Sequence, residues 1–225
     1  MGERRLHVAL DRGWLSTRIV TSPVEIQRCV AAQGLVCLDK DRAPPGVVVR
    51  AEAWVGALPT LSAVVASVVD DLHLLEASPG YDVSHSEPQW PARIFVSIPD
   101  RSDDIGALRF VEGIVHEAMH LQLTLFENQQ PIVADLKGTM PSPWRSEDRP
   151  FGGVVHGLYV FTCLRSLFLQ LAPIASGASQ KHLEGRVREI QAEIASIDVA
   201  ELTPGLTSVG ADLARGWHAR SVAPP

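Results

Sequence analysis

The alternation of hydrophobic and polar positions along the chain predicts a protein built mainly from helices. Apolar residues recur at helical spacing over residues 104–128 and 152–171, and both stretches are apolar on most faces, which is typical of buried helices. Residues 179–197 combine an apolar stripe with many charged positions and predict an outer helix. Residues 204–219 predict one more helix near the end of the chain.

The first hundred residues carry shorter patterns that mix helix and strand. Ser22, Pro23 and Glu25 form a capping box with proline at the first helical position, so a helix should begin at Pro23. The elements predicted in this part are a short hairpin or an irregular start in 6–20, a helix in 23–32, helical turns over 51–75 interrupted at Pro59, a loop over 77–91 and a strand over 93–98.

The two apolar helices are joined by residues 129–151, which contain Pro, Gly and Arg and follow no helical pattern. Connections of this length inside a compact domain are usually functional or disordered. The whole pattern predicts one domain over residues 1–225, mainly α with a minor β component. In it, helices and short strands over 1–100 precede a central part at 101–172 and C-terminal helices at 173–225. A jelly-roll barrel does not fit such long apolar helices.

Composition and charge exclude several classes of partner. The formal charge of −6 and the pI near 5.7 argue against nucleic acid and against an anionic membrane surface, since both need clustered cations. No continuous apolar run approaches the roughly 20 residues that cross a bilayer, so we expect a cytoplasmic protein. The three cysteines are widely spaced without a Cys-x-x-Cys pair, and we expect reduced core residues.

The candidate chemistry lies in the sequence His116-Glu117-Ala118-Met119-His120. Histidines four residues apart on a helix share one face and can bind one metal ion, as in other His-Glu-x-x-His motifs. Gly113 precedes His116 by three residues and leaves room for a close approach to that face, at a cost in helix stability of about 1 kcal/mol. The alternative is a pair of buried histidines held by hydrogen bonds, with Gly113 serving helix packing.

A metal site of this kind needs a third protein ligand, and the familiar zinc-peptidase patterns fail in this chain. Leu123 and Phe126 occupy the places of a downstream Gly and His. The second apolar helix contains no acid but does contain His156, and Gly152, Gly153 and Gly157 beside it would allow close packing against the motif helix. His156 is therefore the predicted third ligand, against the alternative of a core histidine. Asp135, Glu127 and Glu147 remain carboxylate alternatives.

These residues resemble a known family, the HExxH-containing peptide-modifying proteins of ribosomal-peptide biosynthesis. The resemblance rests on Val115 to Leu121, on Ser142-Pro143-Trp144-Arg145, on Arg149-Pro150 and on Gly153 with His156-Gly157. It does not extend to the first hundred residues or to the C-terminal helices. It implies an oxidoreductase, an Fe(II)- and 2-oxoglutarate-dependent dioxygenase that β-hydroxylates a residue of a precursor peptide. A radical S-adenosylmethionine maturase is a further partner it implies, because family members occur alone or fused to such enzymes.

The resemblance gives roles to the remaining candidate residues. His116, His120 and His156 would bind the iron and leave positions open for 2-oxoglutarate and dioxygen, although two histidines and a carboxylate are the usual set. The far carboxylate of 2-oxoglutarate needs a bidentate cation, for which Arg149 is favoured over Arg145. Arginines pairing with Glu147 and Asp148 at the surface are the alternative. Trp144 and Tyr159 are expected to line the pocket, or else to belong to the core.

Two other functions are compatible with the same motif. In a zinc metallopeptidase Glu117 would act as the general base for metal-bound water, whereas in the oxygenase it would orient a ligand or contact the peptide. An inactive module that only holds a precursor peptide is the third hypothesis. An unbroken motif argues against it, because a lapsed site has no physical reason to keep both histidines, the glutamate and the glycine.

Overall fold

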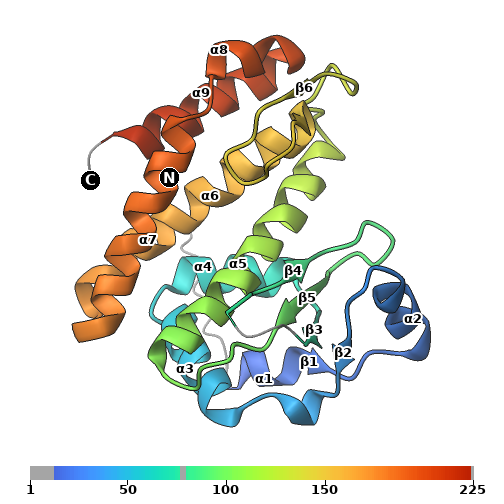
Figure 1. Cartoon of the computed structure of the whole chain (residues 1–225), viewed down its shortest axis with the longest axis vertical. Helices are drawn as coiled ribbons and strands as arrows, with labels where there is room; N and C mark the ends of the chain where they lie inside the picture. Colours follow the sequence, from blue (N-terminus) through green and yellow to red (C-terminus); the bar gives the residue numbers. More distant parts are fainter. Residues whose placement is uncertain (1–12, 77–79, 224–225) are drawn as a thin grey trace, which may run out of the picture. The chain divides into compact units, whose positions relative to one another are not determined.

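The computed structural model of the chain describes residues 13–76 and 80–223. They form two compact units, of which the first ends at Ala118 and the second begins at Met119. Helices dominate both units, and the strands are short and form open sheets (Figure 1). The expected class, mainly α with a minor β component and no jelly roll, is confirmed. The single domain over 1–225 stays a prediction.

The first unit is built on a mixed sheet whose two central strands are parallel and almost wholly buried. β3 (Asp71–Leu75) pairs with β5 (Arg93–Ser97) in register from Asp71↔Arg93 to Leu75↔Ser97. β4 (Ser84–His85) runs antiparallel along the other side of β5. The free edge of β3 carries two short strands, β1 (Ile19–Val20) in parallel and β2 (Cys37–Leu38) antiparallel.

The helices of the first unit are mostly short, and α5 is the long one. Proline starts both α3 and α4, where its missing N–H costs nothing and its fixed φ suits a helix. The helices are α1 (Trp14–Arg18), α2 (Val24–Ala32), a 3-10 turn at Lys40–Arg42, α3 (Pro45–Gly56), α4 (Pro59–Val68) and α5 (Asp104–Glu127), which continues into the second unit.

The two faces of the sheet hold different side chains because neighbours along a strand point in opposite directions. On one face Phe95 lies between His73 and His85, which are its cross-strand partners and stack on its ring at centroid distances of 4.8 and 4.5 Å. Ile26 and Val30 of α2 cover Phe95 there. On the opposite face Val96 lies against Gly113 of α5.

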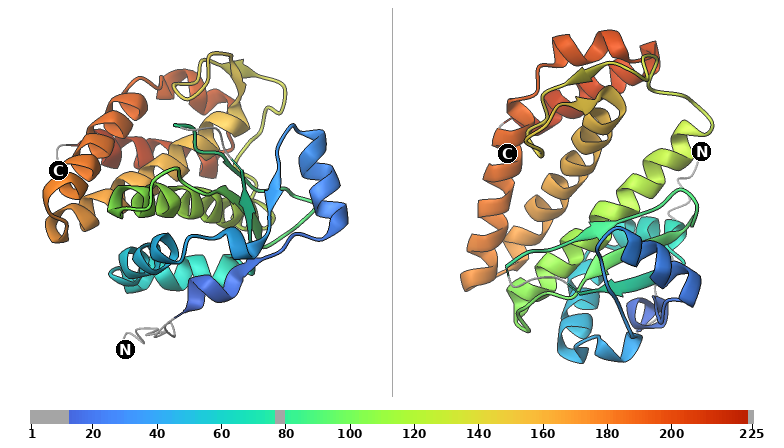
Figure 2. Two further views of the ribbon diagram at one scale, coloured as in Figure 1. Left: turned by 60° about the horizontal axis from the view of Figure 1, so that its bottom comes forward. Right: turned by 45° about the vertical axis from the view of Figure 1, so that its right-hand side comes forward.

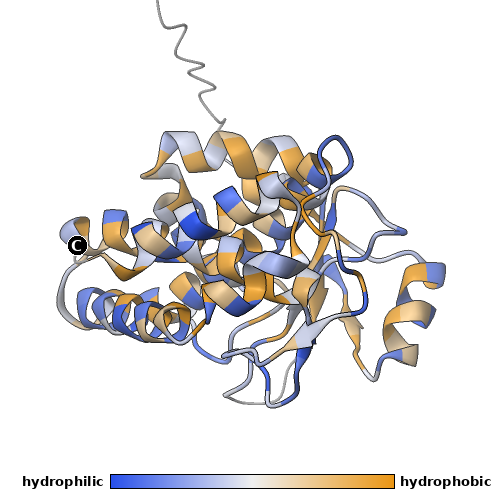
Figure 3. Ribbon diagram, turned by 90° about the horizontal axis from the view of Figure 1, so that it is seen from above, coloured by the Kyte–Doolittle hydropathy of each residue, from blue (hydrophilic) through white to orange (hydrophobic). Residues whose placement is uncertain are grey.

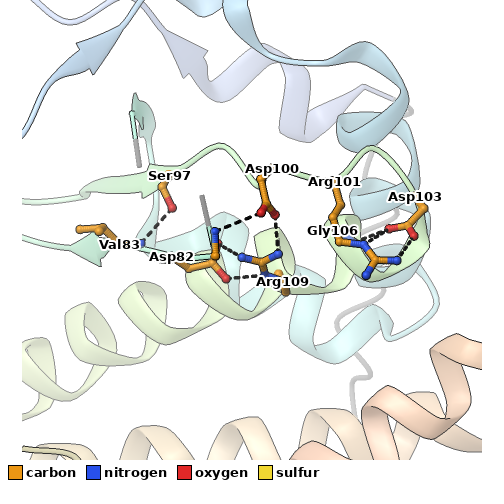
Figure 4. A network of polar contacts seen from close by, with 9 residues as sticks. Asp82, Val83, Ser97, Asp100, Arg101, Asp103, Gly106 and Arg109 are labelled. Atoms are coloured by element: carbon orange, nitrogen blue, oxygen red, sulfur yellow. Dashed lines mark hydrogen bonds and ion pairs between the residues drawn. The ribbon is translucent and has the colours of Figure 1, made fainter. Parts of the chain in front are cut away.

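Arg109 of α5 holds the residues that lead into β4 (Figure 4). Its guanidinium donates to both oxygens of Asp82, at 2.7 and 3.0 Å, and to Asp100 at 2.7 Å. Asp100 also accepts from the backbone N–H of Gly80. These charge-assisted bonds hold the residues before β4, from which Ser84, and Ser86 just after it, reach the motif helix.

The second unit is a helical bundle with a small two-stranded hairpin. The helices α6 and α7 run side by side in both views of Figure 2, and α9 packs on both. Apolar and polar residues interleave along the helices in Figure 3, as expected for helices that bury one side and expose the other. The elements are β6 (Thr139–Met140), β7 (Arg149–Pro150), α6 (Phe151–Leu171), a 3-10 turn at Ala172–Ile174, α7 (Gly177–Ala195), α8 (Val199–Leu202), a 3-10 turn at Thr203–Gly205 and α9 (Ser208–Val222).

The segment Phe151–Ile174, which is α6 with its 3-10 extension, is long and apolar enough to cross a membrane by length and composition. The sequence expectation missed this because it counted only unbroken apolar runs. Of the apolar window, 56% is buried inside the protein, as in the core helix of a bundle. The bent pair of α3 and α4, with an angle of 115° between them, passes the same test together.

Several local expectations for the first unit were wrong. Residues 71–75, expected to be helical, form the central strand β3, and Ser84–His85 form β4 inside the expected loop. Residues 14–18 are a helix rather than part of a hairpin, while residues 6–12 of that expectation lie outside the described part. Ser22 does not cap α2 but bonds His73 at 2.9 Å. Cys29 is exposed and not a core residue, although all three cysteines are free as expected.

Candidate metal centre

The motif histidines lie on α5, which is continuous from Asp104 to Glu127. Asp103 accepts a hydrogen bond from the N–H of Gly106 at 3.0 Å and so caps its first turn. An unbroken helix keeps His116 and His120 at the four-residue spacing that gives both side chains one face. The side chain of His116 is 25% exposed, which leaves it accessible to a ligand.

Glu117 is buried in the first unit and bound to strand β4 and the residue after it. Ser84 donates to one carboxylate oxygen at 2.7 Å and Ser86 to the other at 2.9 Å. Only 3% of the residue is exposed. Burial raises the pKa of Glu117 to about 7, and the two serine hydrogen bonds oppose that rise. The sheet therefore holds this carboxyl in place at the motif helix.

Gly113 serves the packing of α5 on the sheet. A Cβ at this position would meet Cγ1 of Val96 at 2.8 Å, which is closer than carbon atoms approach. This contact is the helix packing that the sequence analysis gave as the alternative use of Gly113, and the packing partner is strand β5.

In the second unit, His120 and His156 face each other. Their Nδ1 atoms are 3.2 Å apart and their rings lie nearly parallel, with an angle of 16° between the planes. The other ring nitrogen of His156, Nε2, lies 2.6 Å from Oε2 of Glu127, the last residue of α5. The structure thus brings His156 into contact with one motif histidine, and Glu127 joins them; the role of His156 as third ligand stays a prediction.

These three side chains line a cavity of about 540 Å³ in the second unit. Arg149 also lines it, and the Nε of Arg149 would lie 3.3 Å from a Cβ at Gly153. Gly153 is three residues before His156, so the guanidinium lies one turn before the imidazole on the same face of α6. The remaining lining is mostly apolar and consists of Pro131, Ile132, Val133, Leu136, Pro150, Gly152 and Gly153.

The donors in this cavity fit a metal that prefers imidazole, such as iron or zinc. Two nitrogens bound to one ion at about 2.1 Å lie about 3.0–3.4 Å apart, and the two Nδ1 atoms are 3.2 Å apart. A histidine ligand usually donates its other N–H to a carboxylate, as His156 does to Glu127. Within residues 13–76 and 80–223, however, no group of three or more His, Cys, Asp or Glu side chains is already arranged around a metal position.

The aromatic candidates lie away from this cavity. Trp144 covers Gly157, where a Cβ would meet its ring at 2.3 Å, and it stacks on Phe161 at 4.6 Å. Its indole N–H donates to Glu193 at 3.1 Å. The Tyr159 hydroxyl donates to Gln122, and its ring packs on Trp217. Neither residue lines the cavity, so the structure puts both in the packing of the helices.

The other charged candidates are also separate from the two histidines. Arg145 and Glu147 are exposed on the connection before α6 and do not line the cavity. Asp135 accepts the backbone N–H groups of Lys137 and Gly138 and so serves a local turn. Of the carboxylates weighed as alternatives to His156, Glu127 alone lines the cavity, and it contacts His156 itself.

The sequence did not reveal the serines that bind Glu117, and it gave two glycines the wrong packing partner. Ser84 and Ser86 fell in an expected loop with no motif, and nothing in the sequence connected them to Glu117. The glycines at 153 and 157, expected to pack against the motif helix, instead have Arg149 and Trp144 as nearest neighbours. The chain matches no protein-family model and no curated protein.

Proposed function

We propose that the chain is an Fe(II)- and 2-oxoglutarate-dependent dioxygenase that hydroxylates the β-carbon of a residue in a ribosomally made precursor peptide. The observation that carries the proposal is the pair of Nδ1 atoms of His120 and His156, 3.2 Å apart in a cavity that Arg149 also lines. We further propose a cytoplasmic location, with a radical S-adenosylmethionine maturase as a second partner.

His116, His120 and His156 are the proposed iron ligands. The spacing of the first two on one helix and the contact between the last two support this set, in which His116 does not itself line the cavity and is proposed from its spacing alone. Bound Fe(II) would supply activation of dioxygen, so that one oxygen enters the peptide C–H bond and the other enters succinate as 2-oxoglutarate loses carbon dioxide.

Arg149 is the proposed partner of the far carboxylate of 2-oxoglutarate. Its guanidinium lies beside the first turn of α6, whose opening N–H groups have no partner within the helix and favour an anion. A fork of N–H donors binds a carboxylate through two parallel hydrogen bonds. Arg145 is proposed no longer for this role, because it does not line the cavity.

The mainly apolar lining serves the chemistry by excluding water. Ile132 is wholly buried, and Pro131, Val133 and Pro150 add apolar surface around the histidines. Low polarity around a reacting centre strengthens the electrostatic contacts made inside it and limits side reactions with water. Leu136, at 81% exposed, gives the cavity an apolar rim that a peptide side chain can contact.

The test needs no knowledge of the precursor. Metal-free protein is titrated anaerobically with Fe(II) and 2-oxoglutarate, and the visible charge-transfer band of the chelate is recorded for wild type, His156→Ala and Arg149→Ala. We expect a band in wild type that weakens in both variants. Arg145→Ala is the matched control and should keep the wild-type band.

A band that survives both changes would support the oxygenase chemistry and refute the roles of His156 and Arg149. The absence of a band, together with zinc retention and cleavage of a generic peptide, would refute the oxygenase and establish the zinc metallopeptidase. One observation favours that second candidate: burial raises the pKa of Glu117 to about 7, which suits a general base near neutral pH.

A further inference from the structure

Glu127 makes a short contact with the histidine proposed as third ligand. Its Oε2 lies 2.6 Å from Nε2 of His156. An ionised carboxylate can only accept hydrogen bonds, so the hydrogen between them belongs to the imidazole nitrogen. A neutral imidazole carries one N–H, and the lone pair of His156 must then be on Nδ1.

That lone pair points to the other histidine. The Nδ1 of His156 lies 3.2 Å from the Nδ1 of His120. With His156 Nδ1 as acceptor, the hydrogen of this bond comes from His120. The two contacts therefore form a directed chain, in which His120 donates to His156 and His156 donates to Glu127.

We propose that Glu127 is a positioning residue that fixes the tautomer of His156 and makes Nδ1 its metal-binding atom. This inference rests on the proposed function, because it names the nitrogen through which that site would bind its ion. Glu127 touches neither metal nor substrate in this role and acts through the ring of His156. Such carboxylate partners also raise the basicity of the imidazole they hold.

The site chemistry agrees with this role and not with Glu127 as a ligand. The carboxylate of Glu127 contacts Nε2 of His156, which is the ring nitrogen remote from His120. The imidazole of His156 therefore separates Glu127 from the place where the two Nδ1 atoms meet. Ion binding to both Nδ1 atoms requires His120 to lose the hydrogen on its Nδ1. No such change is required of His156, whose lone pair already faces the site.

The first readout uses the metal-free protein. Long-range ¹H–¹⁵N NMR at a pH where the imidazoles are neutral reports which nitrogen of each histidine carries hydrogen. We expect Nε2–H for His156 in wild type and a mixture of tautomers in Glu127→Leu. A wild-type His156 with hydrogen on Nδ1, or a tautomer unchanged in Glu127→Leu, would overturn the inference.

The second readout is the affinity for Co(II), used as a spectroscopic substitute for Fe(II). Loss of a partner that orients a histidine ligand typically weakens metal affinity by about 10–100-fold, and this is the result expected for Glu127→Leu. Glu127→Gln keeps an amide oxygen that can accept from Nε2 and should fall between wild type and Glu127→Leu. Glu184→Leu and Glu184→Gln, exposed on α7, are matched controls.

The two readouts separate this inference from the proposed function. Co(II) binding by wild type with equal affinity in Glu127→Leu would overturn the role of Glu127 and leave the metal site intact. Failure of wild type to bind Co(II) or Fe(II) would refute the metal site, and with it Nδ1 as a ligand atom. The tautomer result would then still decide whether Glu127 orients the ring. Far-ultraviolet circular dichroism confirms that each variant is folded.

Discussion

At the scale of single residues, Glu117 is the group whose surroundings say most about the reaction. It is nearly sealed from solvent and accepts hydrogen bonds on both oxygens from Ser84 and Ser86. A carboxyl that must activate water needs access to that water, whereas a carboxyl that only orients a neighbouring ligand does not. The serine contacts therefore favour the orienting role that the oxygenase assigns to it.

Glu117→Gln tests this role. Glutamine keeps the size of the side chain and can still bond the serine hydroxyls, so the oxygenase should retain its Fe(II)–2-oxoglutarate band. In a peptidase the same change removes the general base and should lower hydrolysis by about 10²–10⁴-fold. The measurement is the band intensity together with cleavage of a generic peptide. Loss of the band in Glu117→Gln, with Ser86→Ala unaffected, would contradict the orienting role.

The sequence pointed to imidazoles that meet in the structure, but not to the groups that hold Glu117 between them. Motif spacing and an acid-free second helix were enough to single out His120 and His156, which the structure brings into contact. The supporting serines could not be found, because a hydroxyl that crosses from a strand to a helix leaves no spacing in the sequence. Trp144 shows the opposite error, since an aromatic residue near a motif need not face the site.

At the scale of elements, the connection between α5 and α6 is held to the helices by its tryptophan. Trp144 covers Gly157 of α6, stacks on Phe161 and donates to Glu193 of α7. These three contacts hold a connection that the sequence could only describe as functional or disordered. They fix the chain at a point five residues before Arg149, which lines the cavity.

Gly157→Ala should therefore destabilise the second unit. The new Cβ would lie 2.3 Å from the Trp144 ring, whose stacking and hydrogen bond oppose its displacement. Overpacking of this kind costs about 1–3 kcal/mol in the free energy of unfolding, measured by urea denaturation. The control is Gly185→Ala on α7, where a Cβ meets nothing within 4 Å. That change should gain up to about 1 kcal/mol from helix propensity. Equal effects at both positions would contradict the packing role of Gly157.

Element by element, long helices were easier to predict than short strands. The helix expected over 104–128 is α5, and the one over 152–171 is α6, within a residue at each end. Residues 71–75 have leucines at both helical and alternating spacing, so local pattern alone could not choose between helix and strand. The parallel pairing with β5, a contact between residues distant in sequence, makes them a strand.

At the scale of the whole molecule, the buried histidines of the sheet should make the free energy of unfolding depend on pH. Burial lowers the pKa of both His73 and His85 below the usual 6.5, with Arg93 adding to the effect at His73 and Asp71 and Glu87 opposing it. The neutral forms are favoured by folding. Their contribution is present above pH 6.5 and is lost as pH falls through the lowered pKa.

His85→Phe isolates this effect. Phenylalanine keeps a ring on Phe95 but cannot be protonated, so the variant should lose less stability than wild type between pH 7 and pH 5 in urea denaturation. Glu117 also contributes to the pH dependence, because its raised pKa stabilises the fold as pH falls from about 7. Both proteins contain Glu117, so its contribution cancels when their profiles are compared. Parallel pH profiles for the two proteins would contradict the prediction.

Metal binding should also be visible in the stability of the whole chain. A ligand that binds only the folded state adds about 2.7 kcal/mol at a hundred times its dissociation constant. For a chain of this length, that raises Tm by about 5–10 °C. We expect Fe(II) or Zn(II) to give this rise in wild type, a chelator to reverse it, and His156→Ala to abolish it. A rise of the same size in His156→Ala would place the ion elsewhere.

The stacking of His73 and His85 on Phe95, with interplanar angles of 18° and 4°, has a consequence for spectroscopy. Hydrogens that lie over the face of a benzene ring feel its ring current, and their resonances move to lower frequency. These two imidazoles should thus give outlying signals, distinct from those of His120 and His156. In one proton spectrum, the signals of His73 and His85 would then report whether the sheet is intact, and those of His120 and His156 whether the cavity holds an ion.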